Sequence, residues 1–264
     1  MPEARTTPEP TLTSIPPAGA HPAPAGSAVE IWWARVDVGN LSDDTRTRLA
    51  SDLDESRTAK IERYRRAEDR DRGLAAHSLL RRVLTSVTGT PPAELDLGSF
   101  CITCNEHGHG KPYLSSGDGA RPVELNLSHS GEIVIVALAA PGVQIGVDVE
   151  QSRTVDWDAM RSSIFADQEW AATERRTDRE HRRLFTWARK ESSVKASGHG
   201  LSLPLRGVVT VEETEGTWSA SMPQGVGRVA GADLDLGPDV AAAVAVLRES
   251  GWPEPPALHQ VEIG

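Results

Sequence analysis

The sequence predicts an α+β fold with two lobes. Helical periodicity and strand-like alternation both occur in the first half of the 264 residues, and both occur again in the second half. The hydrophobic fraction of 38% and the charged fraction of 25% fit a globular protein, and the length suffices for one large domain or two small ones. Because each half carries helices and antiparallel-looking strands, two lobes of mixed structure are expected.

The first half should begin with a strand of sequence AVEIWWARVDV. Its β-branched and aromatic residues favour a strand, in which Trp32 and Trp33 point to opposite faces. One helix is expected over 42–64 and a second over 67–89, the second closed by a glycine and two prolines. A short strand near VELNLSH and the apolar strand EIVIVALAA follow, and the turn APGV predicts a hairpin across 132–149.

The second half is expected to contain three helices and then three strands. The helices are predicted near VDWDAMRSSIF, ADQEWAATERRT and EHRRLFTWARKESSVKAS, and the strands near RGVVTVEE, TWSASMP and DVAAAVAVLRE. Residues 1–27 are rich in Pro and Ala and nearly free of large apolar groups, so we expect a disordered tail. Residues 253–264 are expected to form a loose C-terminal tail.

Charge and hydropathy exclude two classes of partner. A net charge of −10 argues against broad attraction to nucleic acid or to an anionic membrane. The longest apolar run, IVIVALAA, is far shorter than the roughly 20 residues of a membrane helix. The N-terminus lacks the charged-then-apolar pattern of a signal peptide, so a cytoplasmic location is expected.

The two cysteines, Cys101 and Cys104, stand close to His107 and His109 in the segment CITCNEHGHG. A zinc ribbon takes four ligands, usually from two separated pairs, and the sequence has no second cysteine pair. A closely packed Cys-Cys-His-His site is one interpretation. A loop with two reduced thiols is the other, and the sequence leaves the choice open.

Two carboxylates share one face of an expected strand. In QIGVDVE, apolar residues alternate with Gly146, Asp148 and Glu150, so both acids project from the same side. Well-fixed carboxylates suit a hard cation that takes oxygen ligands. A solvated face of an edge strand is the alternative.

Further candidates lie on a helix and on two loops. Trp187, Glu191 and Lys195 occur at i, i+4 and i+8, which is one stripe of a helix or an ordinary surface ion pair. The segment LNLSHSG offers hydroxyl and imidazole donors to a phosphate, although a polar turn would look the same. The segment GKP places the cation of Lys111 in a constrained loop.

Taken together, the order and spacing of these segments resemble a known family. GKP, NLSHSG, IGVDVE and FTWARKESSVKASGHGLSLPL match, in this order, the motifs of the surfactin-synthetase-type (Sfp-type) 4′-phosphopantetheinyl transferases. The resemblance covers roughly residues 29–250. It implies two similar α/β lobes related by a pseudo-twofold axis, over 28–144 and 145–252, with the active site in the cleft between them.

The resemblance also implies an activity. Such enzymes are monomers that transfer the 4′-phosphopantetheine arm of coenzyme A, with Mg²⁺, to a serine of an acyl or peptidyl carrier protein. The carriers belong to polyketide, nonribosomal-peptide or fatty-acid synthases, and the resemblance favours secondary metabolism. Neither the individual carrier nor the tolerance for acyl-coenzyme A follows from the sequence.

Site residues follow from the matched motifs. The metal ligands would be Asp148, Glu150 and Glu191, and Glu191 would also be the general base, acting directly or through water. Lys195 would reach the diphosphate. The resemblance further implies that coenzyme A is bound by Arg57, Lys60, Arg72, Lys111, Ser128, His129 and Lys195, with His129 among the catalytic residues. It places Glu169 near the active site without a defined role.

Two rival functions use the same residues. A magnesium-dependent phosphohydrolase would release phosphate or nucleotide without a carrier protein. A non-catalytic homologue would only bind coenzyme A or a carrier. The three carboxylates, Lys195 and His129 are all present, which argues against the second rival.

Overall fold

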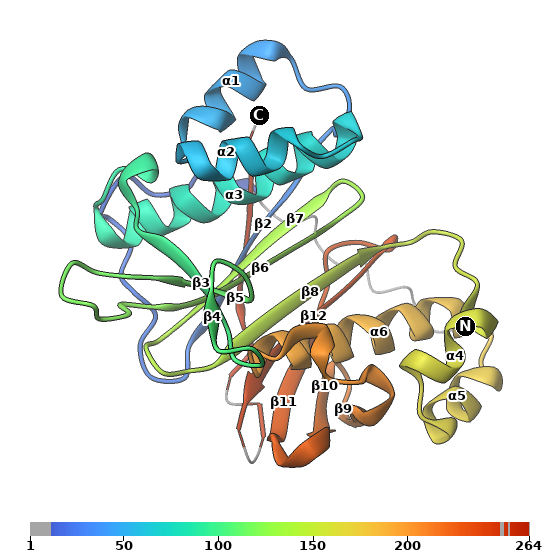
Figure 1. Cartoon of the computed structure of the whole chain (residues 1–264). Coiled ribbons are helices and arrows are strands. Elements are labelled where there is room, and N and C mark those ends of the chain that lie inside the picture. The colour runs from blue at the N-terminus through green and yellow to red at the C-terminus, as the bar shows by residue number, and fades with distance from the viewer. Residues whose placement is uncertain (1–11, 249–250, 253, 264) are drawn as a thin grey trace.

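The computed structural model describes residues 12–248, 251–252 and 254–263, in which three β-sheets and six α-helices form the fold (Figure 1). The first sheet has the order β1-β13-β2-β7-β6, with β1 (Leu12–Thr13), β2 (Val29–Arg35), β6 (Glu124–Ser130), β7 (Ile133–Ala139) and β13 (Ala257–Val261). The second has the order β8-β12-β11-β10-β9, with β8 (Ile145–Gln151), β9 (Val209–Thr214), β10 (Thr217–Met222), β11 (Gly227–Leu234) and β12 (Val240–Leu247). A small sheet, β4-β3-β5, contains β3 (Leu97–Cys101), β4 (Glu106–His107) and β5 (Lys111–Leu114). The helices are α1 (Asp43–Ser51), α2 (Glu55–Glu62), α3 (Ala67–Thr88), α4 (Trp157–Ile164), α5 (Asp167–Glu174) and α6 (Arg179–Ala196).

The two large sheets pack face to face, and a long helix covers the outer face of each. Trp33, Ile135 and Val147, from three strands, meet in the apolar core between the sheets. Trp32 belongs to the other core, under α3, so the predicted opposite orientation of the two tryptophans is confirmed. In the second half, α6 packs on β8 and β12, on the side of the molecule away from α3 (Figure 1). The predicted α+β class is confirmed.

The predicted hairpin across 132–149 is wrong. β7 pairs with β2 and β6, whereas β8 pairs with β12 on the far side of the apolar core. Both strands are apolar, and an apolar strand can be buried equally well by a hydrogen-bonded neighbour or by a facing sheet. The turn between them therefore carries the chain from one sheet to the other.

The helices follow the sequence pattern with one difference. The long helices over 67–88 and 179–196 form as predicted. The helix expected over 42–64 is divided, because Asp54 accepts a hydrogen bond from the backbone of Arg57 (2.8 Å) and so begins a new helix, α2. No helix in the described part of the chain is long and apolar enough to cross a membrane.

The segments that begin and end the described part of the chain pack against the first sheet and α3. Residues 12–27 were expected in a disordered tail, but β1 pairs with β13, and His21 donates a backbone hydrogen bond to the Ser86 carbonyl (2.9 Å). The expected loose C-terminal tail instead contributes β13, which pairs with β2. Composition cannot reveal such pairing, because the partner is distant in sequence; residues 1–11 lie outside the described part.

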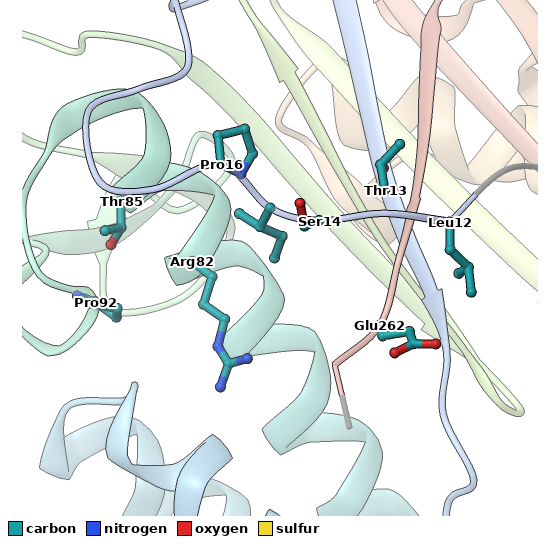
Figure 2. A pocket seen from close by; sticks show the side chains of 9 residues that line it. Leu12, Thr13, Ser14, Pro16, Arg82, Thr85, Pro92 and Glu262 are labelled. Atoms are coloured by element: carbon teal, nitrogen blue, oxygen red, sulfur yellow. The ribbon is translucent and has the colours of Figure 1, made fainter.

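A cavity of about 560 Å³ lies between α3 and the described N-terminal and C-terminal segments (Figure 2). Leu12 and Pro16 line it from the N-terminal segment, Arg82 and Thr85 from α3, and Glu262 from the C-terminal segment. The predicted site residues are not among the side chains that line it in the described structure. The cavity is therefore separate from the site that the sequence indicates.

The sequence pattern missed β11 and the small sheet. β11 reads GRVAGADL, and its small residues have weak strand propensity. They are small for a reason: a Cβ atom on Gly231 would lie 2.1 Å from the Trp218 ring of β10. The neighbouring Trp218 therefore explains why residue 231 is a glycine, and this neighbour is known only from the structure.

Candidate active site

Close packing of α6 on β8 builds the site. A Cβ atom on Gly146 would lie 2.1 Å from the Ser192 carbonyl oxygen and 2.3 Å from the Ala196 backbone nitrogen. Only glycine allows the helix backbone to approach the strand so closely. Glu191 and Lys195, one turn apart on α6, are thereby brought to the polar face of β8.

Asp148 lies at the centre and is buried, with 4% of its surface exposed. Its Oδ1 atom accepts hydrogen bonds from Ser128 Oγ (2.8 Å) and Lys195 Nζ (2.5 Å), and Lys195 also donates to Ser128 Oγ (3.0 Å). The other oxygen, Oδ2, is buried and has no hydrogen-bond partner among the described residues. A buried carboxylate oxygen without a partner is costly, so this atom marks a place for a ligand. Lys195 pairs with Asp148 rather than forming the surface pair with Glu191.

Two further carboxylates flank Asp148. Glu150 accepts a hydrogen bond from Ser130 Oγ (2.9 Å), and Glu191 accepts one from Trp187 Nε1 (3.3 Å). Burial, and then the negative charge of Asp148, raise the pKa of Glu150 and the pKa of Glu191. The charge of Asp148 thus opposes the ionisation of both flanking acids, which a bound cation would relieve.

The donor set fits a hard divalent cation. Three carboxylates and two hydroxyls supply only oxygen, which Mg²⁺ prefers, and Asp148 Oδ2 has no competing protein donor. The carboxylate oxygens of Asp148, Glu150 and Glu191 do not all lie within 4.8 Å of one another. The three would therefore not all bind one ion directly here, and water would complete the coordination shell, as is usual for Mg²⁺.

Basic residues gather on the other side of β6. His129 follows Ser128 in the strand, so its side chain leaves the opposite face. The His129 side chain is exposed, and partial desolvation by surrounding atoms, followed by the charge of Arg72, lowers its pKa. Arg72 Nε donates to a carbonyl in the β6–β7 turn (2.7 Å). Burial, followed by the charges of Arg57 and His129, lowers the pKa of His77 on α3 to about 3, so its imidazole is neutral.

The two predicted coenzyme A residues on α2 differ in position. Arg57 is partly buried and close enough to His77 to act on its ionisation. Lys60, three residues later, is exposed, and it makes no hydrogen bond or ion pair with the other candidates in the described structure. Arg57 is therefore electrostatically coupled to His77, whereas Lys60 is exposed to solvent.

A cavity of about 300 Å³ opens beside Lys195. Lys111 and Pro112 line one wall, Leu127 of β6 another, and Gly198 closes it from the loop after α6. Lys111 Nζ donates a hydrogen bond to the Ala196 carbonyl (3.2 Å). Burial lowers the pKa of Lys111, and the opposite effect of nearby Glu124 is smaller. An apolar slot with two cations at its edge suits a flat nucleotide base with phosphates.

Sequence reasoning missed three functional or supporting residues. Ser130 belongs to the segment that the sequence predicts as either a phosphate-binding loop or a polar turn, but it is the last residue of β6 and donates a hydrogen bond to Glu150. Lys190 lies on the reverse side of α6, fully buried, and bonds Glu169 Oε2 (2.6 Å). Glu169 also accepts hydrogen bonds from the backbone nitrogens of Thr210 and Ala166 (2.9 Å each). It therefore holds α5 against α6, and it is not one of the residues around Asp148. His77 gave no sequence signal beyond its place on a helix.

Both halves of the chain match known protein families. Residues 42–141 match the N-terminal domain of 4′-phosphopantetheinyl transferase, and residues 144–244 match the 4′-phosphopantetheinyl transferase superfamily. The chain is similar to a phosphopantetheinyl transferase of Thraustochytrium, with 30% identity over 228 residues covering 75% of this chain and 76% of the relative. It is also similar to 4′-phosphopantetheinyl transferase HetI of Nostoc (28%, covering 77% and 82%) and to 4′-phosphopantetheinyl transferase Sfp of Bacillus subtilis (28%, covering 69% and 77%). This chain therefore belongs to the 4′-phosphopantetheinyl transferase superfamily.

Proposed function

We propose that this transferase moves the 4′-phosphopantetheine arm of coenzyme A to a serine hydroxyl of an acyl or peptidyl carrier protein and releases 3′,5′-ADP. The observation that carries the proposal is the free, buried Oδ2 of Asp148, surrounded by two further acids and by Lys195. The 300 Å³ cavity beside Lys195 would give the nucleotide a place near the lysine that pairs with Asp148. A diphosphate can therefore meet both a cation site and a lysine.

Coenzyme A would be held by residues from both halves of the chain. Lys111 and the cavity beside it would receive the adenine, and Ser128 with Lys195 would contact the diphosphate. Arg72, Arg57 and His129 would bind the 3′-phosphate side, with Lys60 adding charge at the solvent edge. All are polar or cationic groups that phosphate oxygens accept from.

Asp148 and Glu150 would hold a magnesium ion, with Glu191 reaching it through water. When bound, the ion supplies neutralising charge to the diphosphate. Phosphoryl transfer relies mainly on positioning and charge, so the fixed strand β8 and helix α6 are suitable supports.

Glu191 would be the general base. The serine oxygen forms a bond to the β-phosphorus, the bond from that phosphorus to the oxygen of the departing 3′,5′-ADP breaks, and the serine proton passes to Glu191 or to an intervening water. Burial and the charge of Asp148 raise the pKa of Glu191 in the metal-free protein, whereas a bound ion would lower it, so positioning of the serine hydroxyl would carry much of the effect. Lys195 lies one turn away and would balance the charge on the leaving group.

Several finer properties belong to the same proposal. Ser128 and Asp148 come from the two halves of one chain and already meet, so no second copy is needed, and we propose a monomer. The lobes would divide near residue 144. Coenzyme A is an intracellular metabolite, which favours a cytoplasmic location. The carriers would be domains of polyketide, nonribosomal-peptide or fatty-acid synthases.

Incubation with coenzyme A, Mg²⁺ and a panel of apo-carrier domains, read by intact mass, tests the activity. The expected result is a mass increase of one phosphopantetheine arm on at least one carrier, and none on the same carrier with its serine replaced by alanine. Release of phosphate or nucleotide without any carrier would instead identify a phosphohydrolase. Binding of coenzyme A with no product would identify a non-catalytic homologue.

A further inference from the structure

The loop between β3 and β5 brings two thiols and an imidazole together. β3 ends at Cys101, the chain turns through Cys104, and His109 follows after β4. The two Sγ atoms and one ring nitrogen of His109 all lie within 4.8 Å of one another, and Cys104 Sγ is 3.2 Å from His109 Nε2. Three atoms at such distances can bind a single ion after small side-chain movements.

The backbone of the loop is shaped for this meeting. Asn105 and Gly108 adopt positive φ angles of 59° and 94°, which reverse the chain on each side of β4. A Cβ atom on Gly110 would lie 2.4 Å from the Phe100 carbonyl oxygen, so the segment after His109 lies directly against β3. His109 is thereby carried back to the cysteines.

His107 is turned away from the cluster. Its ring packs against Phe100 with 5.1 Å between centroids, and its Nδ1 atom lies 3.2 Å from the Tyr113 hydroxyl. The Cys-Cys-His-His set that the sequence left open is therefore reduced to three protein ligands. His107 becomes a matched control, since it is a histidine of the same loop with other partners.

We propose that Cys101, Cys104 and His109 bind a zinc ion, with a fourth position open to water. Thiolate and imidazole are the ligands that Zn²⁺ takes in proteins, and two sulfurs disfavour Mg²⁺ and Ca²⁺. On binding, both thiols lose their protons to solvent, and each sulfur forms a bond to the metal.

The site would stiffen one wall of the nucleotide cavity. Cys101, Gly110 and Lys111 all line that cavity. In the same loop, Thr103 Oγ1 lies 2.7 Å from Ser202 Oγ in the second half of the chain. A metal at this place would hold the β3–β5 loop, which contacts the second half of the chain, beside the coenzyme A pocket. It would take no part in the chemistry of the carboxylates.

Cobalt substitution tests the site without any assay of transfer. The full chain is reduced with a phosphine, stripped with a chelator and titrated with Co²⁺ in the absence of oxygen. We expect one cobalt per chain, with sulfur-to-cobalt charge-transfer absorption and the visible bands of a tetrahedral ion, and displacement by one equivalent of Zn²⁺. Carboxylate-bound cobalt gives no sulfur absorption, so Asp148→Asn should keep the signal.

Variants of the loop decide the ligand set. Cys104→Ser should lose most of the charge-transfer absorption, and His109→Gln should weaken cobalt binding by more than about tenfold, the least that loss of even an outer-shell partner costs. His107→Gln should behave as the unaltered chain. The proposal is overturned if the unaltered chain gives no sulfur-to-cobalt band, if His107→Gln loses it as fully as His109→Gln, or if intact mass shows a Cys101–Cys104 disulfide under the reducing conditions.

Discussion

Lys195 Nζ lies 2.5 Å from Asp148 Oδ1, whereas the second oxygen of Asp148 is buried without a partner among the described residues. A lysine from α6 thus neutralises one side of the acid and leaves the other side free. The pairing joins the long helix of the second half to strand β8, and Ser128 ties both to β6. The account of the site depends on this arrangement.

Gly146→Ala should both destabilise the chain and slow transfer. The new methyl group would meet the backbone of α6 at Ser192 and Ala196, which cannot move aside as a side chain can. Overpacking of this kind costs about 1–3 kcal/mol of unfolding free energy and would shift Glu191 and Lys195. Denaturant unfolding together with kcat measures both effects. Gly117→Ala is the control, because nothing lies within 4 Å of its Cβ position, and equal behaviour of the two variants would contradict the close-packing argument.

The acid limb of the pH–rate profile should report Glu191. Activity should fall as the pH decreases through the pKa of Glu191, which burial and next Asp148 raise and which a bound ion would lower. The Trp187 hydrogen bond lowers this pKa, so Trp187→Phe should move the acid limb to higher pH. The measurement is kcat against pH at saturating coenzyme A. An acid limb that does not move, or moves to lower pH, would argue against Glu191 as the base.

Magnesium should stabilise the chain more at neutral pH than in acid. Glu150 and Glu191 have raised pKa values in the folded state, so their ionisation costs stability as the pH rises past the ordinary carboxylate range. An ion bound there should raise the unfolding free energy by about 2.7 kcal/mol at about 100 times its Kd. Thermal unfolding with Mg²⁺ or with a chelator, at pH 7.5 and below pH 4, checks this. The same gain at both pH values would mean that these acids do not hold the ion.

Glu169 should prove structural. Lys190 is fully buried, and burial lowers its pKa. The negative charge of Glu169 acts in the opposite direction and favours the charged lysine. Glu169→Gln therefore leaves a buried charge without its acidic partner. Breaking a buried pair in this way costs about 3–5 kcal/mol. The double variant Glu169→Gln, Lys190→Met should recover part of that loss. Under conditions where the variants stay folded, KM for coenzyme A should be unchanged; a large rise would place Glu169 in the binding site instead.

The sequence predicts those features that depend on residues close together in the chain. The helical repeat through Leu79 and Val83 predicts α3, and alternation predicts both β8 and the divergent tryptophans of β2. Sequence motifs likewise bring Asp148, Glu150 and Glu191 into one candidate site before any contact is known.

Features that depend on distant partners are different. Nothing in the local sequence indicates that β7 and β8 lie in different sheets or that β13 joins the first sheet. The hydrogen bond from Ser130 to Glu150 has no local signal either. The choice of His109 over His107 is similar, because it follows from the backbone angles at Asn105 and Gly108. In each case a neighbour in space, rather than in sequence, decides the outcome.

The most direct test of the account is the intact mass of an apo-carrier protein after reaction with coenzyme A and Mg²⁺, with the unaltered chain and with Asp148→Asn. The unaltered chain should add one phosphopantetheine arm, and the variant should be slower by more than about 100-fold, the size of effect that loss of one charge-stabilising group causes. Asp158→Asn, an exposed acid on α4, should react at the normal rate. Undiminished transfer by Asp148→Asn would contradict the central claim that Asp148 anchors the catalytic cation.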